Sequence, residues 1–290
     1  MRTLATGVAL AGGLVLSGAA SGQTVFGITR DNRLVSFNPA TPGTLTVDVA
    51  ITGLTAGETA IGIDVRPLTS EIFVFGSGNR MYSVSTGGVA TPVGTGFTAL
   101  ATTTSSFDFN PTVDRVRVVD AAGNNRRLNP ATGGDAASDT ALTYGTGGTP
   151  RAVGVAYTNA QFGANVAAGT VRELFVDSTL NSLGEIGTMA GGNASFNGGV
   201  SSTIGGLGFD LFDDAGFDLY GPTGIVYLSN LGTTGAASFY TVNIGTGAAS
   251  LVGQIGTGNR FVTDIAVLPA PGAAGLAGVG LLALARRRRR

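Results

Sequence analysis

The sequence predicts an all-β, β-propeller-like domain of five blades that is closed by pairing of its N- and C-terminal strands. Between Thr24 and Leu268, short alternating segments rich in Val, Ile, Phe, Tyr and Thr are separated by clusters of Gly, Asn, Pro and Thr, without a useful helical period. The whole chain has 48 glycines, and many of them lie in these clusters, as tight turns require. Segments of one pattern also recur about every 44 to 55 residues, close to the length of a propeller blade.

The recurring pattern begins with a strand that carries a central acid. Its acid-bearing copies are Ile61–Val65, Phe107–Asn110, Leu207–Leu211 and Thr263–Val267, and Val153–Tyr157 fits without the acid. A second segment follows, at Asn32–Ser36, Asn79–Ser83, Asn125–Asn129 and Ala237–Thr241. Turns rich in Pro and Gly then lead to outer strands such as Ala90–Gly94 and Ala249–Gly253. Each unit therefore offers four short strands, which make one blade.

The two ends of the repeat region complement each other. The first unit, Thr24–Gly53, lacks an acid-bearing inner strand, whereas Phe261–Leu268 is such a strand with nothing after it. Pairing them would close the ring and hide sheet edges. The expected blades are 24–54 with 261–268, then about 60–97, 105–145, 151–189 and 204–256. A sixth blade remains an alternative if Ala190–Gly206 contains divergent strands.

The first 22 residues have the order of a secretory signal peptide. One positive charge at Arg2 precedes the apolar stretch Leu4–Leu16, and small residues follow, with Ala20 and Gly22 suited to signal peptidase. We expect cleavage before Gln23. The repeat domain then spans residues 24–268, and residues 269–290 form a separate tail.

This tail has three parts: the motif Pro269-Ala270-Pro271, an apolar stretch and a basic cluster. The stretch, Gly272–Ala285, has fourteen residues, which is short for a stable membrane span. The cluster that ends the chain consists of Arg286, Arg287, Arg288, Arg289 and Arg290. The order resembles the PEP-CTERM sorting signal, and that resemblance implies an exosortase-like enzyme as a partner. Ala270 replaces the glutamate usual in that motif. A permanent transmembrane helix is the alternative interpretation of the tail.

Several runs in the repeat region resemble the bacterial exported family known as domain of unknown function 4394. The runs are Asp31–Leu34, Gly57–Thr59, Gly62–Pro67 and Phe107–Val119, and the last is the most specific. The resemblance covers about residues 24–267. It implies a propeller-like fold and no established activity.

Composition excludes several classes of function. Cys, His, Trp and Lys are absent, so the chain cannot build a Ser-His-Asp triad, a Cys nucleophile or a conventional zinc site. Without residues 1–22 and 272–290, eleven arginines face eighteen acids, a net charge of −7. This sign disfavours nucleic acids and anionic lipids as partners. Contact with a membrane is expected only through the tail.

Acids on the recurring inner strands are the candidate binding residues: Asp64, Asp108, Asp210 and Asp264. In a propeller they would converge on the central channel, where carboxylates could bind Ca²⁺. The alternative is structural, because a carboxylate that accepts hydrogen bonds or pairs with arginine can lock one blade to the next. Asp210, Asp213, Asp214 and Asp218 are crowded together, but without the spacing of an EF-hand. A solvated loop is the expected account of that cluster.

Four arginines form the main basic concentration of the repeat region: Arg115, Arg117, Arg126 and Arg127. With Asp108, Asp114 and Asp120 nearby, cross-strand ion pairs are the expected explanation. Contact with an anion or an acidic polysaccharide is the alternative.

These observations favour an exported, non-catalytic binding or structural protein of the cell surface or extracellular matrix. Its ligand is open, with exopolysaccharide and other envelope components as candidates, and no cofactor is expected other than possible Ca²⁺. The alternative is a carboxylate- or calcium-dependent propeller enzyme of the lactonase or glycan-cleaving type.

Overall fold

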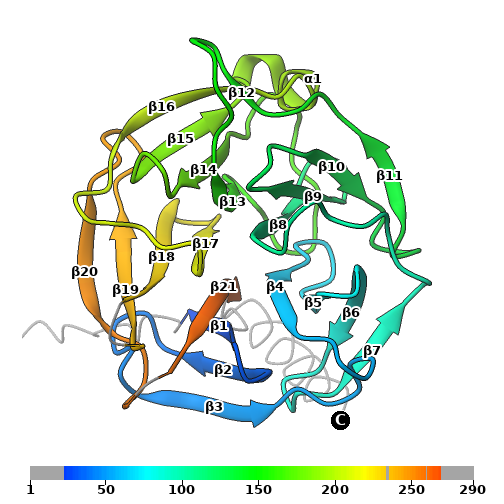
Figure 1. Cartoon of the computed structure of the whole chain (residues 1–290), viewed down its shortest axis with the longest axis vertical. Helices are drawn as coiled ribbons and strands as arrows, with labels where there is room; N and C mark the ends of the chain where they lie inside the picture. The colour runs from blue at the N-terminus through cyan, green and yellow to red at the C-terminus, as the bar shows by residue number, and fades with distance from the viewer. Residues whose placement is uncertain (1–22, 233–234, 259, 269–290) are drawn as a thin grey trace, which may run out of the picture. The chain divides into compact units, whose positions relative to one another are not determined.

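The computed structural model describes residues 23–232, 235–258 and 260–268, and these residues form a five-bladed β-propeller. Figure 1 shows five small sheets arranged around a common axis. The predicted signal peptide and sorting tail lie outside the described residues. Within them, no helix is both long and apolar enough to cross a membrane.

Each blade has four antiparallel strands that follow one another from the axis outward. The first blade consists of β21 (Val262–Leu268), β1 (Thr24–Thr29), β2 (Arg33–Phe37) and β3 (Leu45–Ala50). The second consists of β4 (Ala60–Val65), β5 (Ile72–Gly76), β6 (Arg80–Val84) and β7 (Ala90–Val93). The third consists of β8 (Ser105–Asn110), β9 (Arg115–Asp120), β10 (Asn125–Leu128) and β11 (Asp135–Ser138).

The fourth blade carries additions. Its strands are β13 (Ala152–Tyr157), β14 (Glu173–Asp177), β15 (Ser182–Ile186) and β16 (Val200–Gly206), with the short β12 (Thr143–Tyr144) parallel to β16 at the rim. Between β15 and β16 lie a 3₁₀ turn (Met189–Gly191) and α1 (Gly192–Asn197). The fifth blade consists of β17 (Ala215–Tyr220), β18 (Ile225–Leu231), β19 (Ala237–Val242) and β20 (Ala249–Gln254).

The predicted closure of the ring is confirmed. Strand β21 pairs antiparallel with β1, with Thr24 opposite Leu268 and Gly27 opposite Ile265. The inner edge of the first blade therefore comes from the end of the repeat region and its other strands from the beginning. The two ends of the repeat region can separate only if this pairing breaks.

The five-blade count is also confirmed, but two predicted boundaries are wrong. Residues 190–206 contain no sixth blade: they form the end of the 3₁₀ turn, α1 and the outer strand β16 of the fourth blade. The fifth blade accordingly begins at Ala215 and not near residue 204. Thr143–Tyr144, expected in the third blade, joins the sheet of the fourth.

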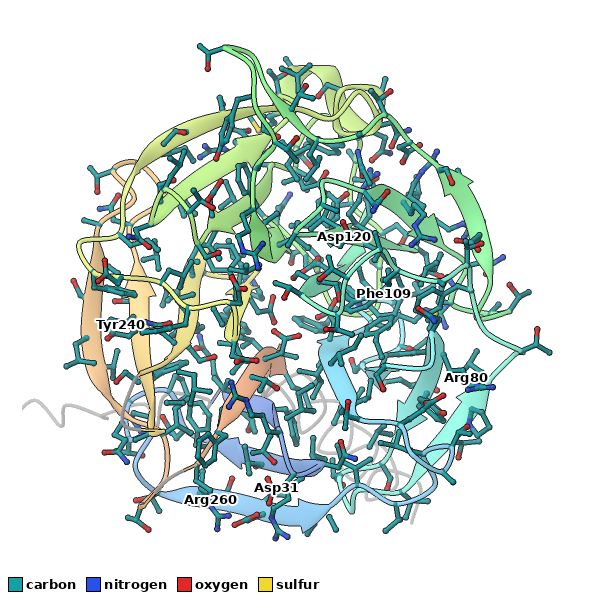
Figure 2. The ribbon with its side chains drawn as sticks, viewed as in Figure 1. Asp31, Arg80, Phe109, Asp120, Tyr240 and Arg260 are labelled. Carbon is teal, nitrogen blue, oxygen red and sulfur yellow. The ribbon has the colours of Figure 1, made fainter. Side chains whose placement is uncertain are left out.

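The hydrophobic core lies between neighbouring blades because both faces of each sheet are covered. Phe75 of the second blade, for example, stacks on Phe107 of the third with ring centroids 4.0 Å apart. Figure 2 shows Phe109, from the same interface, nearer the axis than Arg80 and Arg260. A single blade could not bury its apolar faces alone, so the ring stabilises every blade.

Glycines on the inner strands let the blades approach closely at the axis. A Cβ atom on Gly62 would lie 2.3 Å from the ring of Phe107, and one on Gly216 would lie 2.4 Å from the backbone N of Ile265. The contact at Gly216 is with backbone, which cannot move without shifting a whole strand.

The arginines of the third blade bind partners within the protein. Arg117 is 1% exposed and lies between the third and fourth blades. Its Nη1 donates to Asn125 Oδ1 (2.7 Å) and Asp139 Oδ2 (2.6 Å), and its Nε donates to Tyr157 Oη (3.0 Å). Glu173 Oε1 lies 3.3 Å from the same Nε, but the only hydrogen on Nε points to Tyr157.

The neighbouring arginines have internal partners too. Arg127 binds both carboxylate oxygens of Asp139, and Arg126 donates to the carbonyls of Thr98 and Ala99. Arg115 is half-buried and donates to the carbonyl of Asp114. Arg117 and Arg127 therefore form ion pairs, as expected, but their partner is Asp139 and not Asp108, Asp114 or Asp120.

We predict that Gly216→Ala destabilises the fold by about 1–3 kcal/mol or more, because the added methyl would overlap the backbone of β21. The measurement is the free energy of unfolding from urea titration. Gly206→Ala is the matched control, since nothing lies within 4 Å of its added Cβ. A change of more than about 0.5 kcal/mol in the control, or none at Gly216, would contradict this account of the axis.

We also predict that Arg117→Ala lowers the free energy of unfolding by about 3–5 kcal/mol, because it leaves Asp139 and Glu173 buried without the guanidinium between them. Arg115→Ala should change it by less than about 1 kcal/mol. If both variants lost the same free energy of unfolding in this titration, the buried ion pair would not be the cause of the destabilisation.

Candidate functional site

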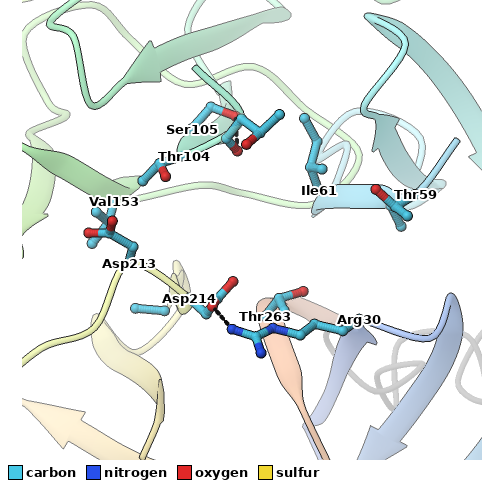
Figure 3. Close-up of a pocket in the computed structure, with 12 residues that line it drawn as sticks. Arg30, Thr59, Ile61, Thr104, Ser105, Val153, Asp213, Asp214 and Thr263 are labelled. Carbon is cyan, nitrogen blue, oxygen red and sulfur yellow. Dashed lines mark hydrogen bonds and ion pairs between the residues drawn. The ribbon is translucent and has the colours of Figure 1, made fainter.

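The inner strands begin together at one end of the axis, where they surround an open pocket. Each contributes its first or second residue to the lining: Ala60, Ser105, Val153, Ala215 and Thr263. The pocket has a volume of about 360 Å³, and Figure 3 shows its lining residues facing one another across the axis. We call it the mouth pocket.

Hydroxyl groups are frequent in the mouth pocket. Thr59, Thr103 and Thr104 come from the loops that lead into β4 and β8, and their hydroxyls have no hydrogen-bond partner among the described residues. Thr263, from β21, donates weakly to the carbonyl of Ile28 at 3.4 Å. A hydroxyl both donates and accepts, so these groups can bind either kind of partner.

The carboxylates of the mouth pocket are already paired. Asp213 accepts from Arg151 through both carboxylate oxygens and from Ser178 Oγ at 2.8 Å. The hydrogen bond from Arg151 lowers the pKa of Asp213, although both side chains are about two-fifths exposed and solvent weakens the pair. Asp214 is paired with Arg30, as Figure 3 shows.

Deeper along the axis, three carboxylates join neighbouring inner strands. Asp64 of β4 accepts from the backbone N of Phe109 in β8 (2.6 Å), and Asp218 of β17 accepts from Val267 N in β21 (2.5 Å). Asp108 of β8 accepts from Tyr157 N in β13 at 3.3 Å. The donors occupy equivalent positions, so the three acids share one level of the axis.

Two further side chains make the same kind of link one level nearer the mouth. Asp264 of β21 accepts from Ile63 N in β4 (2.9 Å), and Ser106 of β8 accepts from Val155 N in β13 (2.8 Å). Asp264 thus lies on an inner strand, as predicted, but not in the same ring as Asp64 and Asp108.

Asp64, Asp108 and Asp218 form a compact cluster, which we call the axial carboxylate cluster. One carboxylate oxygen from each lies within 4.8 Å of the other two, and all three residues are buried. Burial and the charge of Asp218 raise the pKa of Asp64, while burial and the charge of Asp64 raise the pKa of Asp108. Burial raises the pKa of Asp218 to about 7.

Asp210 is not an axial residue, and its predicted placement on an inner strand is wrong. It lies between β16 and β17, where its Oδ1 accepts from Asn181 Nδ2 at 3.1 Å. Asp218 takes the axial position in the fifth blade.

The sequence held a signal for this assignment. Gly-Phe-Asp-Leu occurs twice, at 208–211 and 216–219, and only the second copy is followed by a proline turn, at Pro222. Pro67 and Pro111 follow Asp64 and Asp108 at nearly the same distance. The turn after the strand therefore distinguishes the axial copy.

Comparison with known proteins identifies a family and no activity. The family model described as "Domain of unknown function (DUF4394)" matches residues 33–266. No curated protein matches the chain. Among solved structures, a chain of "Crystal structure of Nidogen/Laminin Complex" aligns with 12% identity and a TM-score of 0.29 over 80% of this chain and 61% of that chain. The match to the family model extends from β2 to β21 and thus includes all five blades, and the chain therefore belongs to the family of domain of unknown function 4394.

Proposed function

We propose that this chain is an exported, non-catalytic binding protein of the cell surface or extracellular matrix. Its mouth pocket would bind a neutral, hydroxyl-rich ligand, such as a segment of exopolysaccharide or another envelope glycan. The observation that carries the proposal is a pocket lined by all five blades whose threonine hydroxyls are largely unpartnered and whose carboxylates are already paired.

The chemistry of the lining supports a sugar-like ligand. Hydroxyls of Thr59, Thr103 and Thr104 can exchange hydrogen bonds with ligand hydroxyls in either direction. The paired carboxylates of Asp213 and Asp214 retain lone pairs that can accept from a ligand. A phosphorylated ligand is disfavoured, because the domain carries a net charge of −7 and the guanidinium of Arg30 is held by Asp214.

The state of the acids argues against catalysis at the mouth. A general acid or base works best when its pKa lies near the ambient pH. Arg151 lowers the pKa of Asp213, so this carboxylate stays ionised and would not donate a proton. Without His or Cys, the chain also lacks the commonest nucleophile systems.

An enzyme remains the second candidate, because the pKa of Asp218 is raised to about 7, near the value a proton-transfer group needs. Asp218, Asp64 and Asp108 line a separate, much smaller cavity that shares no lining residue with the mouth pocket. A saccharide in the mouth would therefore not contact them, which favours binding over cleavage.

Export is part of the proposal and rests on the two ends of the chain. The charged, apolar and small regions of residues 1–22 suit signal peptidase, and residues 269–290 suit an exosortase-like sorting enzyme. The absence of cysteine is compatible with an oxidising destination, where the fold depends on packing between blades.

We expect the protein to bind neutral oligosaccharides on a glycan array, and Thr59→Trp to weaken the strongest interaction at least about tenfold by filling the mouth pocket. Isothermal titration calorimetry with that oligosaccharide gives the affinities. Thr59 is exposed, so the substitution should leave the fold intact.

Ser250→Trp is the matched control, since Ser250 lies on the outer strand β20, away from the mouth pocket, and its side chain reaches solvent. Equal weakening in both variants, or no binding to any neutral glycan, would contradict the assigned pocket. Release of new reducing ends from the bound glycan would instead support the glycan-cleaving alternative.

Mass spectrometry of protein recovered from the surface of the native host should show an N-terminus at Gln23 and loss of Arg286 to Arg290. Both changes follow if the two ends are substrates for export and sorting. Surface protein that retains all five arginines would instead indicate a permanent membrane anchor.

A further inference from the structure

The axial carboxylate cluster surrounds a space for one small occupant. Asp64, Asp108 and Asp218 line a small cavity at the end of the axis away from the mouth pocket. The space open to the centre of a water molecule is about 10 Å³, which is close to the minimum for a single water. The cavity can therefore hold one water or one monatomic ion, and no larger ligand.

The axial carboxylate cluster has no cationic partner among the described residues. None of the ion pairs among the described residues involves Asp64, Asp108 or Asp218. Two arginines of the same blades are committed elsewhere, Arg66 to Asp114 and Arg117 to Asp139. The other charged groups that act on the cluster, Asp264 and Glu173, are also acids.

Asp108 provides a separate indication of a ligand. Its side chain lines the cavity and the residue is only 5% exposed. Its Oδ1 makes a long hydrogen bond of 3.3 Å to Tyr157 N, and its Oδ2 has no hydrogen-bond partner among the described residues. This oxygen belongs to a buried residue that lines the cavity, so it is available to bind an occupant there.

The other two carboxylates are held rigidly. Asp64 accepts from Val65 N and Phe109 N, both at 2.6 Å, and Asp218 accepts from Leu219 N and Val267 N, both at 2.5 Å. These N–H groups favour the ionised form and fix its position, but they do not neutralise its charge. Each oxygen retains a lone pair that can bind a cation.

A long segment of the fourth blade covers the cavity. The residues between β13 and β14 include Ala160 and Phe162, which line the cavity. The same segment is fixed to the second and third blades by hydrogen bonds from Gly163 N to Pro67 O (2.8 Å) and from Val166 N to Pro111 O (3.0 Å). An occupant would therefore lie between the three acids and this segment.

We propose that the axial carboxylate cluster binds one Ca²⁺ ion, with Asp64, Asp108 and Asp218 as ligands. Oxygens on opposite sides of a Ca²⁺ lie about 4.6–5.2 Å apart, so three oxygens within 4.8 Å of one another can share one ion. The three carboxylates can supply up to about six oxygens, within the number that calcium takes. Mg²⁺ keeps several waters, for which the cavity has no room.

Such an ion would connect the second, third and fifth blades, because one ligand comes from each of β4, β8 and β17. It would stabilise the closed ring independently of what the mouth pocket binds. The site differs from the ring predicted from sequence, since Asp218 replaces Asp210 and Asp264 lies outside it.

The test uses the whole chain, stripped with EDTA and dialysed, with Ca²⁺ as the probe. Equilibrium dialysis should give one Ca²⁺ per chain. At a Ca²⁺ concentration about 100 times the dissociation constant, the melting temperature should rise by about 5–10 °C. Mg²⁺ at the same concentration should give a smaller rise, and an equal rise would overturn the assignment to calcium.

Asp108→Asn should reduce Ca²⁺ affinity at least about tenfold. It should leave the metal-free melting temperature unchanged or higher, because it removes a repelling charge and keeps an oxygen for Tyr157 N. If this variant does not fold, Asp218→Asn is measured with the same expectation for Ca²⁺.

Asp264→Asn is the matched control, because Asp264 is also a buried acid on an inner strand that bonds to the next strand. It should keep the calcium response even if its metal-free melting temperature falls. The proposal is overturned if the wild-type chain binds no Ca²⁺, if Asp108→Asn retains the response, or if Asp264→Asn loses it equally.

Discussion

The fold depends on how the backbone N–H groups of the inner strands find hydrogen-bond acceptors at the axis. One edge of each inner strand has no neighbouring strand in its own sheet, so N–H groups face the axis where a buried, unpaired donor is costly. Side chains of the adjacent blade supply the acceptors: Asp64, Asp108, Asp218, Asp264 and Ser106. Glycines at Gly62 and Gly216 allow the close approach that these bonds need. Most of the acceptors are acids, so the same arrangement concentrates carboxyl groups at the centre of the ring.

The fourth blade interrupts this pattern. At the two levels of the axis, β13 has Gly154 and Ala156, and no side chain links it to β17 among the hydrogen bonds of the described residues. The gap is filled by an apolar contact, since a Cβ on Gly154 would lie 2.5 Å from Cβ of Phe217. At these two levels the polar connections of β13 are made on its other side, where Ser106 and Asp108 of β8 accept from Val155 N and Tyr157 N. The cluster of three acids is thus open toward the fourth blade, whose long segment after β13 covers it.

The sequence predicted the five blades and their closure because both follow from a repeat that the whole chain obeys. It failed where the repeat is locally ambiguous. Gly-Phe-Asp-Leu occurs at 208–211 and at 216–219, and strand pattern alone cannot rank the two copies. In the first, Leu207 and Leu211 pack into the core between the fourth and fifth blades while Asp210 bonds to Asn181 outside the axis. The sequence also could not show at which level of the axis each acid lies. A shift of two residues between neighbouring strands preserves the alternation of side chains but moves Asp264 to another ring.

The two ends of the axis differ in whether arginine pairs with the acids there. The repeat domain has eleven arginines for eighteen acids, and among the described residues Asp64, Asp108 and Asp218 take part in no ion pair. At the mouth, Arg30 and Arg151 pair with Asp214 and Asp213, which leaves a polar surface without uncompensated charge. At the far end no arginine among the described residues pairs with the cluster, so its three carboxyl groups, with one oxygen of each within 4.8 Å of the others, must either hold protons or bind a cation. Arginine there would neutralise the charge but would not fit a cavity of about 10 Å³. A monatomic ion satisfies both constraints, which is why we assign ligand binding to the mouth and metal binding to the far end.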